Sequence, residues 1–421
     1  MTRPSLCCSH CGAIYPPLSP RADCSCGGLL DVLQCPREGA LALRARFDER
    51  RASGDPPVQG SGVWRFRELL LPGRGPTLTH PEGNTALYRR EAIARFAGHD
   101  DLALKHEGEN PSGSFKDRGM TVAVTQAVRA GATAVACAST GNTSASMAAY
   151  AAQAGLPALV FVPAGKVAAG KLAQALAYGA RTLLVKADFD ACLRLVRDAA
   201  EAFGIALLNS INPWRIEGQK TIVWELLQQR GWQAPDWIVV PAGNLGNTSA
   251  FGKALREARA LGLVRRVPRL AAVQAAGASP FYRSFRGGFR ERFKVEAETV
   301  ATAIRIGDPA SHARAVRAIR ETDGVVTAVS DREILEAKAV VDAAGVGCEP
   351  ASAASVAGTR RLVREGVIRP GQSVVAILTG HLLKDPAIVM DYHSRRGRGR
   401  NPPLLIEPRL QDVEKALRRK A

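Results

Sequence analysis

Short apolar runs recur along most of the chain, and Ala-rich stretches with apolar positions at helical spacing separate them. The runs are Ala134–Ala138, Ala158–Val162, Arg181–Val185, Trp237–Val240, Leu270–Gln274 and Ser373–Leu378. Because these runs are apolar on both faces, they predict strands buried on both sides, as in a parallel sheet covered by helices. Strands that alternate with helices indicate an α/β architecture, in which functional residues are expected in the loops after the strand carboxyl ends.

The length of the chain, 421 residues, exceeds what one hydrophobic core usually serves, so we expect two or three structural units. The segment Phe47–Pro76 is polar and punctuated by Pro and Gly, with an apolar helical piece at Trp64–Leu71, and is typical of a connector. No apolar run approaches the roughly 18 to 20 residues that a membrane span needs, and Met1–His10 lacks the blocks of a signal peptide. We therefore expect a soluble, cytoplasmic protein with no membrane partner.

The charge balance is strongly basic, with 57 Lys and Arg against 39 Asp and Glu and a net charge of +18. A basic balance raises the possibility of nucleic-acid binding, but the charge is spread along the chain rather than gathered in one stripe. The densest run is Arg395, Arg396, Arg398 and Arg400, and no aromatic residues interleave with it as in single-strand binders. We interpret this run as a solvated tail and expect no nucleic-acid partner. The positive charge would still attract a small phosphorylated substrate.

Five of the nine cysteines lie within the first 26 residues. Clustered cysteines in a cytosolic chain more often hold a metal than form disulfides. Cys8-x-x-Cys11 and Cys24-x-Cys26, the latter followed by two glycines, predict a tetrahedral zinc site on two tight turns. The single residue between the second pair departs from the usual spacing, so other ligands and a metal-free remnant stay open. The alternative ligands are Cys7, His10 and Cys35.

Two familiar nucleotide-binding motifs are not supported. The segment Gly165–Lys171 follows most of the P-loop pattern, but Leu172 stands where the motif needs a hydroxyl to hold Mg²⁺. No G-x-G-x-x-G follows a predicted strand, so a Rossmann dinucleotide site has little support. These absences disfavour an ATPase and a nicotinamide-dependent enzyme.

A loop rich in glycine and hydroxyls, Pro241–Ser249 (PAGNLGNTS), follows the predicted strand Trp237–Val240 and leads into a helix. Glycines let successive backbone N–H groups converge, and the N-terminus of the following helix adds a favourable dipole. A tight strand-to-helix turn is the alternative, but two Gly-Asn steps and two hydroxyls exceed what such a turn requires. The loop therefore predicts a phosphate cradle.

Two further polar loops precede predicted helices. Cys137–Ser144 (CASTGNTS) offers hydroxyls and free N–H groups that would bind a carboxylate, although a simple helix cap would use the same residues. Asn110–Gly119 places Lys116 where a helix opens, and this position is ambiguous by itself.

Five motifs then occur in a fixed order between Pro81 and Pro386, namely NPSGSFKDRGM, ASTGNTSAS, PAGNLGNTSA, CEPASAA and LTGHLLKDP. Their order and spacing resemble the threonine synthase family, which consists of pyridoxal-phosphate enzymes of the tryptophan-synthase-β-like fold (fold type II). The N-terminal cysteine pattern also occurs in some members. The resemblance implies an α/β fold with two parallel-sheet α/β domains and a small N-terminal zinc-ribbon-like unit.

The resemblance also implies how the chain divides. The units are a zinc-ribbon-like unit at 1–45, a connector at 46–78, a large cofactor-binding domain at 79–118 and 208–392, a small mobile domain at 119–207, and a basic C-terminal tail at 393–421. Closure of the small domain would exclude all water except the reacting molecule.

Carried onto this chain, the family motifs imply that Lys116 is the catalytic lysine, which binds the cofactor as a Schiff base and later moves protons at Cα and Cβ of the substrate. Asn142 would hydrogen-bond the 3′ oxygen of the cofactor ring, and Thr379 would contact the pyridine nitrogen. A hydroxyl does not keep that nitrogen protonated, so the ring withdraws electrons less strongly than a protonated ring would. The cofactor phosphate would lie on Gly243, Asn244, Leu245, Gly246 and Asn247.

The same motifs imply a substrate site. Its members would be Ser139, Thr140 and Thr143 for the substrate carboxylate, and Asn209, Ser210 and Arg215 for a substrate phosphate. Arginine recognises such an anion with two parallel hydrogen bonds, although a surface ion pair is the alternative role for Arg215. Glu349 is expected to line the pocket of the cofactor ring.

The function implied by the resemblance is that of a lyase, a homodimer, that converts O-phospho-L-homoserine and water to L-threonine and phosphate. A serine or threonine dehydratase, or a synthase that uses phosphoserine, could share every cofactor residue and stays open. From another class, a zinc-ribbon nucleic-acid-binding protein without catalysis would keep Cys8–Cys26 and the basic tail, but Lys116 and the phosphate loop argue against it.

Overall fold

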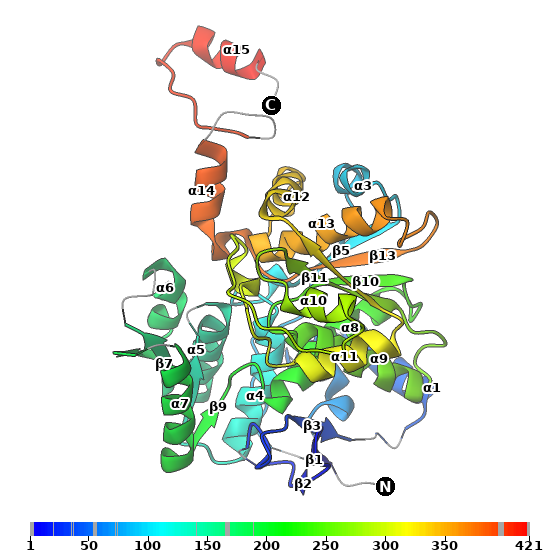
Figure 1. Ribbon diagram of the computed structural model, residues 1–421, viewed down its shortest axis with the longest axis vertical. Coiled ribbons are helices and arrows are strands. Elements are labelled where there is room, and N and C mark those ends of the chain that lie inside the picture. The colour runs from blue at the N-terminus through cyan, green and yellow to red at the C-terminus, as the bar shows by residue number, and fades with distance from the viewer. Residues whose placement is uncertain are drawn as a thin grey trace.

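Three sheets organise the computed structural model, which describes residues 4–19, 21–34, 36, 38–53, 57–71, 73, 75–139, 141–164, 169–187, 189–394 and 400–418 (Figure 1). A three-stranded sheet lies at the N-terminus, a six-stranded sheet forms the centre of the main body, and a four-stranded sheet lies beside it. Within these residues, no helix is both long enough and apolar enough to cross a membrane.

The six-stranded sheet has the strand order β12-β11-β10-β13-β5-β4. Its strands are β4 (Leu87–Tyr88), β5 (Leu102–His106), β10 (Trp237–Pro241), β11 (Arg269–Ala275), β12 (Val325–Val329) and β13 (Val374–Leu378). All neighbouring pairs are parallel except β4 with β5. The parallel strands therefore direct their carboxyl ends to one edge, where an α/β protein places its site.

Helices cover both faces of this sheet, as the apolar runs predict. Ile238 and Val240 pack in one core cluster with α8 (Pro213–Gln229) and α9 (Gly246–Ala260). Trp237 and Val239, the alternate positions of the same strand, pack in a second cluster. That cluster includes residues of α3 (Glu91–Ala97), α12 (Asp331–Ala343) and α13 (Pro350–Arg364). The strand is apolar throughout because both of its faces are buried.

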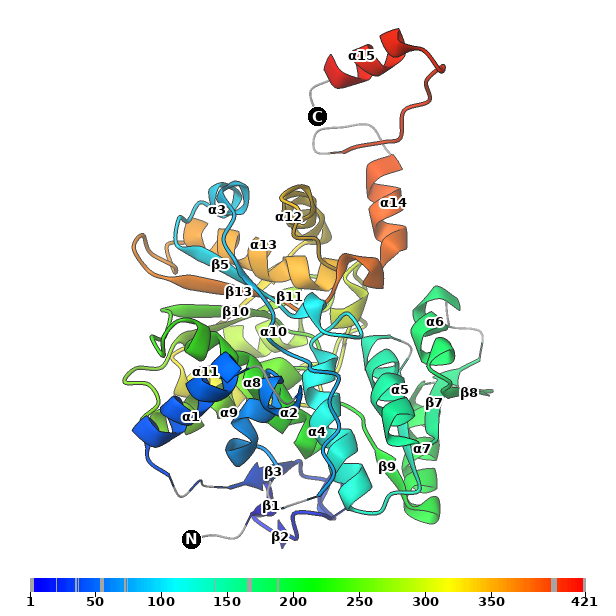
Figure 2. The ribbon, with the colours of Figure 1, turned by 180° about the vertical axis from the view of Figure 1, so that it is seen from behind.

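The four-stranded sheet is entirely parallel, in the order β8-β7-β6-β9. Its strands are β6 (Ala134–Ala138), β7 (Ala158–Pro163), β8 (Arg181–Val185) and β9 (Ile205–Leu207). Helices α5 (Asn142–Ala154), α6 (Ala169–Ala177) and α7 (Phe189–Phe203) connect them, as Figure 2 shows from behind. The whole sheet thus lies within the range 119–207.

Helix α4 (Lys116–Arg129) runs between the two parallel sheets and contacts both α8 and α5. The approach to α8 is so close that a Cβ on Gly218 would come within 1.8 Å of the Arg118 carbonyl oxygen. Only glycine fits there. This close packing fixes the helix that begins at Lys116.

The N-terminal sheet is antiparallel, with β1 (Ser5–Cys8) between β2 (Ile14–Tyr15) and β3 (Leu30–Leu33). Helix α1 (Ala40–Ser53), the turn α2 (Pro57–Gly60) and the 3₁₀ helix η1 (Trp64–Leu69) follow it. Phe47, Trp64 and Phe66 are almost completely buried in the main core. This segment therefore packs as part of the body, although its Pro and Gly residues are typical of a connector.

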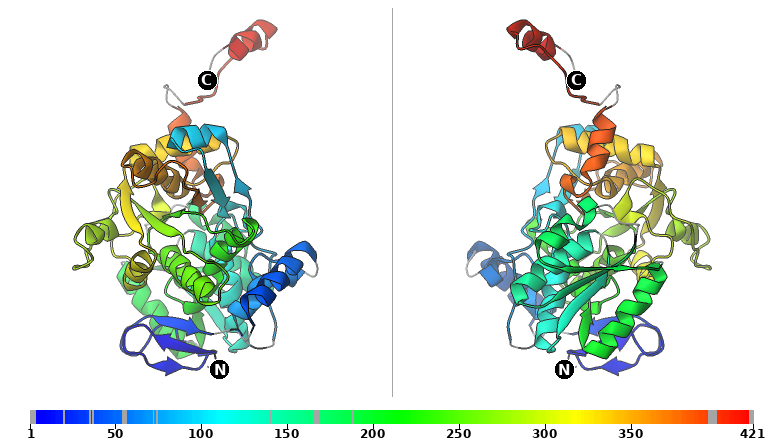
Figure 3. Two further views of the ribbon diagram at one scale, coloured as in Figure 1. Left: turned by 90° about the vertical axis from the view of Figure 1, so that its right-hand side faces the viewer. Right: turned by 90° about the vertical axis from the view of Figure 1, so that its left-hand side faces the viewer.

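The C-terminal helices α14 (Pro386–Ser394) and α15 (Leu410–Arg418) extend away from the body (Figure 3). Of the basic run predicted to be a solvated tail, Arg395, Arg396 and Arg398 lie outside the described residues. Arg400 is described and lies over the ring of Tyr392.

Candidate active site

The loop that leads to Lys116 lies along the loop that follows β13. The Phe115 N–H donates to the Thr379 carbonyl oxygen at 3.0 Å, and the His381 N–H donates to the Gly113 carbonyl oxygen at 2.9 Å. Two motifs separated by more than 260 residues are therefore joined at the carboxyl edge of the six-stranded sheet. Lys116 begins α4 at this point, between the two parallel sheets.

The surroundings of the Lys116 amine favour its uncharged form. Desolvation, aided by the nearby Arg215 charge, lowers the pKa of Lys116 to about 7, and the Glu349 carboxylate opposes the shift only in part. At neutral pH about half of the amines are uncharged, and only the uncharged amine can attack an aldehyde. The Nζ atom lies 4.1 Å from the centre of the Phe115 ring.

The side chain next to Lys116 organises its loop. The Asp117 carboxylate accepts hydrogen bonds from the Ser112 N–H at 2.6 Å, from the Ser112 hydroxyl at 2.5 Å and from the Ser146 hydroxyl at 2.5 Å. Ser146 belongs to α5 of the four-stranded sheet. Asp117 therefore ties the lysine loop to the unit that carries the predicted carboxylate loop.

A second buried charge network, not predicted from the sequence, anchors α4 just after Lys116. Arg118 pairs with Glu107 at 2.5 Å and with Glu225 at 2.8 Å, and Glu225 also pairs with Lys105 and Arg65. All five side chains are essentially inaccessible to water. Burial disfavours ionisation of Glu225, but the three cations around it prevail and hold its pKa well below the ordinary value. Loss of any partner would leave a buried charge uncompensated.

The predicted phosphate loop joins β10 to α9 in a conformation suited to an anion. Leu245 has a φ of 64°, a left-handed conformation that is unusual for a residue with a side chain. A Cβ on Gly243 would lie 2.8 Å from the Ile304 Cα, so a glycine is required. The Asn247 Oδ1 and the Thr248 Oγ1 are buried without a hydrogen-bond partner among the described residues. Buried polar atoms seldom lack partners, and these two lie at a helix N-terminus, where an anion is favoured.

Asn244 holds this loop in place. Its amide nitrogen donates to the Ser210 hydroxyl, and its Oδ1 accepts from the Ala310 N–H at 2.6 Å. The Ser311 N–H, just before α11 (His312–Glu321), donates to the Asn244 carbonyl oxygen at 3.3 Å. The predicted cofactor residue Asn244 and the predicted substrate residue Ser210 are thus in direct contact.

The predicted carboxylate loop lies between β6 and α5. The Ser139 hydroxyl accepts a weak hydrogen bond from the Gly141 N–H at 3.4 Å, and Thr143 lies in the first turn of α5. The predicted substrate residue Thr140 lies outside the described residues. Asn209 is close to this loop because its Oδ1 accepts from the Ala138 N–H at 3.1 Å.

Asn142 and Thr379, both predicted to contact the cofactor ring, share a partner. The Glu349 carboxylate accepts from the Asn142 amide at 3.0 Å and from the Thr379 hydroxyl at 3.2 Å. Thr379 also contacts the Ser352 hydroxyl at 2.9 Å. Burial raises the pKa of Glu349 above its ordinary value. Glu349 and Ser352 both belong to the CEPASAA motif, which was the signal in the sequence for a role at this site.

Arg215 lies in the first turn of α8 and is completely buried. Its Nη1 donates to the Leu208 carbonyl oxygen at 3.1 Å, whereas Nε and Nη2 have no partner among the described residues. Burial lowers the pKa of Arg215 to about 10, so the guanidinium is charged at neutral pH. The alternative role, a surface ion pair, does not fit a side chain that is completely buried. Two buried cationic donors without partners indicate a place for an anion.

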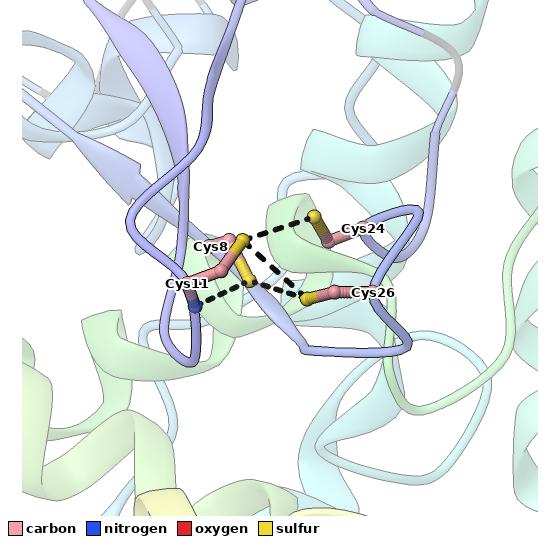
Figure 4. A group of neighbouring side chains, drawn as sticks. All are labelled: Cys8, Cys11, Cys24 and Cys26. Atoms are coloured by element: carbon pink, nitrogen blue, oxygen red, sulfur yellow. Dashed lines mark hydrogen bonds between the residues drawn. The ribbon is translucent and has the colours of Figure 1, made fainter.

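The N-terminal cysteines converge from two turns (Figure 4). The Sγ atoms of Cys8, Cys11, Cys24 and Cys26 all lie within 4.8 Å of one another, and no other such group was found in the described part of the chain. Cys7, an alternative ligand, is outside this group, and its thiol faces the Gly12 carbonyl oxygen. Cys35 lies outside the described residues. Four thiols at such distances fit a tetrahedral metal ion.

Comparison with known proteins shows the family to which the chain belongs. The model of the family described as "Pyridoxal-phosphate dependent enzyme" matches residues 78–380, and the chain belongs to this family. Two relatives that match most of the chain are threonine synthases. That of Methanosarcina acetivorans is 47% identical over 387 residues, which cover 91% of this chain and 93% of the relative. That of Methanocaldococcus jannaschii is 44% identical and covers 90% of this chain and 92% of the relative.

Among solved structures, the chain resembles threonine synthase from Escherichia coli with a TM-score of 0.68 and 18% identity. The match covers 98% of this chain and 99% of that chain, and at this identity it shows the fold alone. The predicted α/β fold of type II and the resemblance to threonine synthases are thereby confirmed.

Proposed function

We propose that this protein is a lyase that acts on the carbon–oxygen bond of a phosphate ester and converts O-phospho-L-homoserine and water to L-threonine and phosphate. The observation that carries the proposal is the position of the Lys116 amine, whose pKa is lowered to about 7, near the buried guanidinium of Arg215, two of whose donors have no partner among the described residues. The first group suits the cofactor and the second suits the phosphate of the substrate.

The residues present fit pyridoxal phosphate. The unpartnered Asn247 and Thr248 oxygens and the converging N–H groups of the phosphate loop would hold its phosphate. Thr379 would contact the ring nitrogen and Asn142 the ring hydroxyl. When bound, pyridoxal phosphate withdraws electrons from the Cα of an amino acid and so permits loss of protons there.

The protein's own side chains would supply the remaining steps. The Lys116 amine, uncharged at neutral pH in about half of the molecules, would accept protons from Cα and Cβ of the substrate, so that the Cβ electron pair can expel the phosphate from Cγ, and would return protons to the carbon chain as water adds at Cβ. The loop that contains Ser139, Thr140 and Thr143 would bind the substrate carboxylate at the start of α5. Asn209, Ser210 and Arg215 would bind the substrate phosphate, whose departure from Cγ is favoured by positive charge.

Movement of the four-stranded sheet would open and close the site. Two hydrogen bonds join this unit to the far side of the site: Asn142 of α5 donates to Glu349, and Lys384 donates to Gln174 of α6. Closure along these contacts would exclude water other than the reacting molecule. The small mobile domain would then be residues 119–207, which remains a prediction.

We also propose that Cys8, Cys11, Cys24 and Cys26 hold one zinc ion, because the four thiols fit the tetrahedral arrangement that zinc prefers. The homodimer and the cytoplasmic location expected from the sequence remain predictions.

The test is to incubate the purified protein with pyridoxal phosphate and O-phospho-L-homoserine and to measure phosphate release and the amino acid formed. Equal amounts of phosphate and threonine would support the proposal. A protein that releases no phosphate but converts threonine to a 2-oxo acid would instead be a dehydratase. The variant Lys116→Ala is the control, because it should lose both products while it keeps the fold.

A further inference from the structure

The N-terminal sheet lies beside the main body (Figure 1) and contacts three of its helices, each of which begins next to residues of the predicted phosphate sites. These are α8, α9 and α11. The contacts come from the last strand of the sheet, β3, and from the residues directly after it.

Helices α8 and α9 meet β3 through a buried charged cluster. The Lys253 Nζ on α9 pairs with Glu217 on α8 and donates to the Val32 carbonyl oxygen at 2.6 Å. The Gln34 amide donates to the other Glu217 oxygen at 3.1 Å. Lys220 pairs with the same carboxylate at 2.6 Å. The N-terminal segment therefore supplies two of the hydrogen bonds that this cluster needs to be buried.

Helix α11 meets the same strand through Arg314. Its Nε pairs with Asp31 at 2.9 Å, and its Nη2 donates to the Leu30 carbonyl oxygen. The Arg314 side chain is almost fully buried. Three consecutive residues of β3 thus bind two different helices of the body.

On each helix, the residue that contacts the N-terminal segment is only a few positions away from a residue at the predicted phosphate sites. Glu217 is two residues after Arg215 on α8. Lys253 is six residues after Asn247 on α9, about 9 Å at 1.5 Å per residue. Arg314 is three residues after Ser311, which donates to Asn244. A packed helix moves as a rigid element, so a displacement at one of these contacts shifts the helix start as well.

We propose that Glu217, Lys253 and Arg314 are positioning residues, through which the N-terminal sheet holds the three helix starts that form the phosphate sites. The proposal rests on the assignment of the phosphate loop under the proposed function. Loss of the contacts to β3 would leave buried charges with fewer partners, and the helices would shift to bring them into contact with water. The N-terminal sheet therefore contributes to phosphate binding although none of its residues lies in the site.

The experiment compares the affinity for pyridoxal 5′-phosphate with that for pyridoxal, which lacks the phosphate. The variants are Asp31→Asn and Gln34→Ala, on the N-terminal side, and Lys253→Met, on the body side. Affinities are measured by titration of the visible absorption of the cofactor bound to Lys116, and folding is checked by circular dichroism. The matched control is Asp101→Asn, which removes an exposed ion pair with Arg89.

We expect each variant to bind pyridoxal 5′-phosphate about 5- to 20-fold more weakly and pyridoxal within twofold of the wild type, with the control unchanged. Should Lys253→Met fail to fold, the two N-terminal variants decide the question. The proposal would be overturned if the folded variants kept the wild-type preference for pyridoxal 5′-phosphate over pyridoxal. An equal loss of affinity for both compounds would overturn it as well. A wild-type protein that binds both compounds equally would overturn the phosphate-loop assignment itself, and this proposal with it.

Discussion

The substitution Arg215→Lys tests whether the buried guanidinium binds the phosphate of the substrate. Lysine keeps the positive charge, so the field at Lys116 and the cofactor-binding amine should change little. The substitution removes the planar pair of donors, Nε and Nη2, that have no partner among the described residues. A lysine ammonium can place at most one hydrogen bond where the guanidinium would place two.

The expected magnitude follows from that difference of one hydrogen bond. A hydrogen bond to a charged group contributes about 1.5 to 3 kcal/mol. Since about 1.4 kcal/mol corresponds to a factor of ten, kcat/KM for O-phospho-L-homoserine should fall roughly 10- to 150-fold. Most of the loss should appear in KM, because the substrate phosphate is bound before it leaves.

The assay compares two ligands in wild type and Arg215→Lys. Phosphate release gives kcat/KM for O-phospho-L-homoserine, and the shift of the visible absorption band gives the affinity for threonine, which has no phosphate. Threonine binding and the band of the resting enzyme should stay within about twofold of the wild type. Equal weakening of both ligands would refute the reasoning, because Arg215 would then support the fold, and a dehydratase would become the better assignment.

Three further predictions address the lysine, the metal and the helix packing. In protein freed of cofactor, the rate at which added pyridoxal phosphate develops its visible band should rise about tenfold from pH 6 to pH 8 and then level off, because the uncharged fraction of Lys116 rises through a pKa of about 7. A rate that continues to rise tenfold per pH unit toward pH 10 would contradict the lowered pKa. Cys8→Ser should lose most of about one zinc per chain, measured by metal analysis, whereas Cys7→Ser should keep it, and equal retention by both would contradict the proposed ligands. Gly218→Ala should lower the free energy of unfolding by about 3 kcal/mol or more, because its Cβ would meet the Arg118 carbonyl oxygen at 1.8 Å. The control is Gly39→Ala, where nothing lies within 4 Å and the free energy of unfolding should change by less than about 0.5 kcal/mol. Similar values for the two variants would contradict the close packing of α4 and α8.

The apolar pattern located six strands, but its prediction that both faces are buried is wrong for one of them. β8 is an edge strand of its sheet, and its Leu184 is 61% exposed. The six predicted runs coincide with β6, β7, β8, β10, β11 and β13 to within a residue at each end. Strand β5 was not predicted, because it contains Lys105 and His106 and so does not read as apolar. Its lysine is buried only because Glu225, 120 residues further along the chain, compensates the charge. A local sequence pattern does not predict a strand whose buried charge is paired with a residue so far away in the sequence.

The motifs likewise predicted where the candidate site lies, because loops that follow parallel strands lie at the carboxyl edge of the sheet. Several properties of the site depended on the tertiary structure instead. The lowered pKa of Lys116 requires the burial and the Arg215 charge that only folding brings to it. The choice of Cys8, Cys11, Cys24 and Cys26 over Cys7 requires the two turns to face each other. The contact between β3 and the helices of the phosphate sites joins residues about 180 to 290 positions apart. Spacing along a chain determines local conformation, whereas burial, charge pairing and coordination depend on which distant side chains meet.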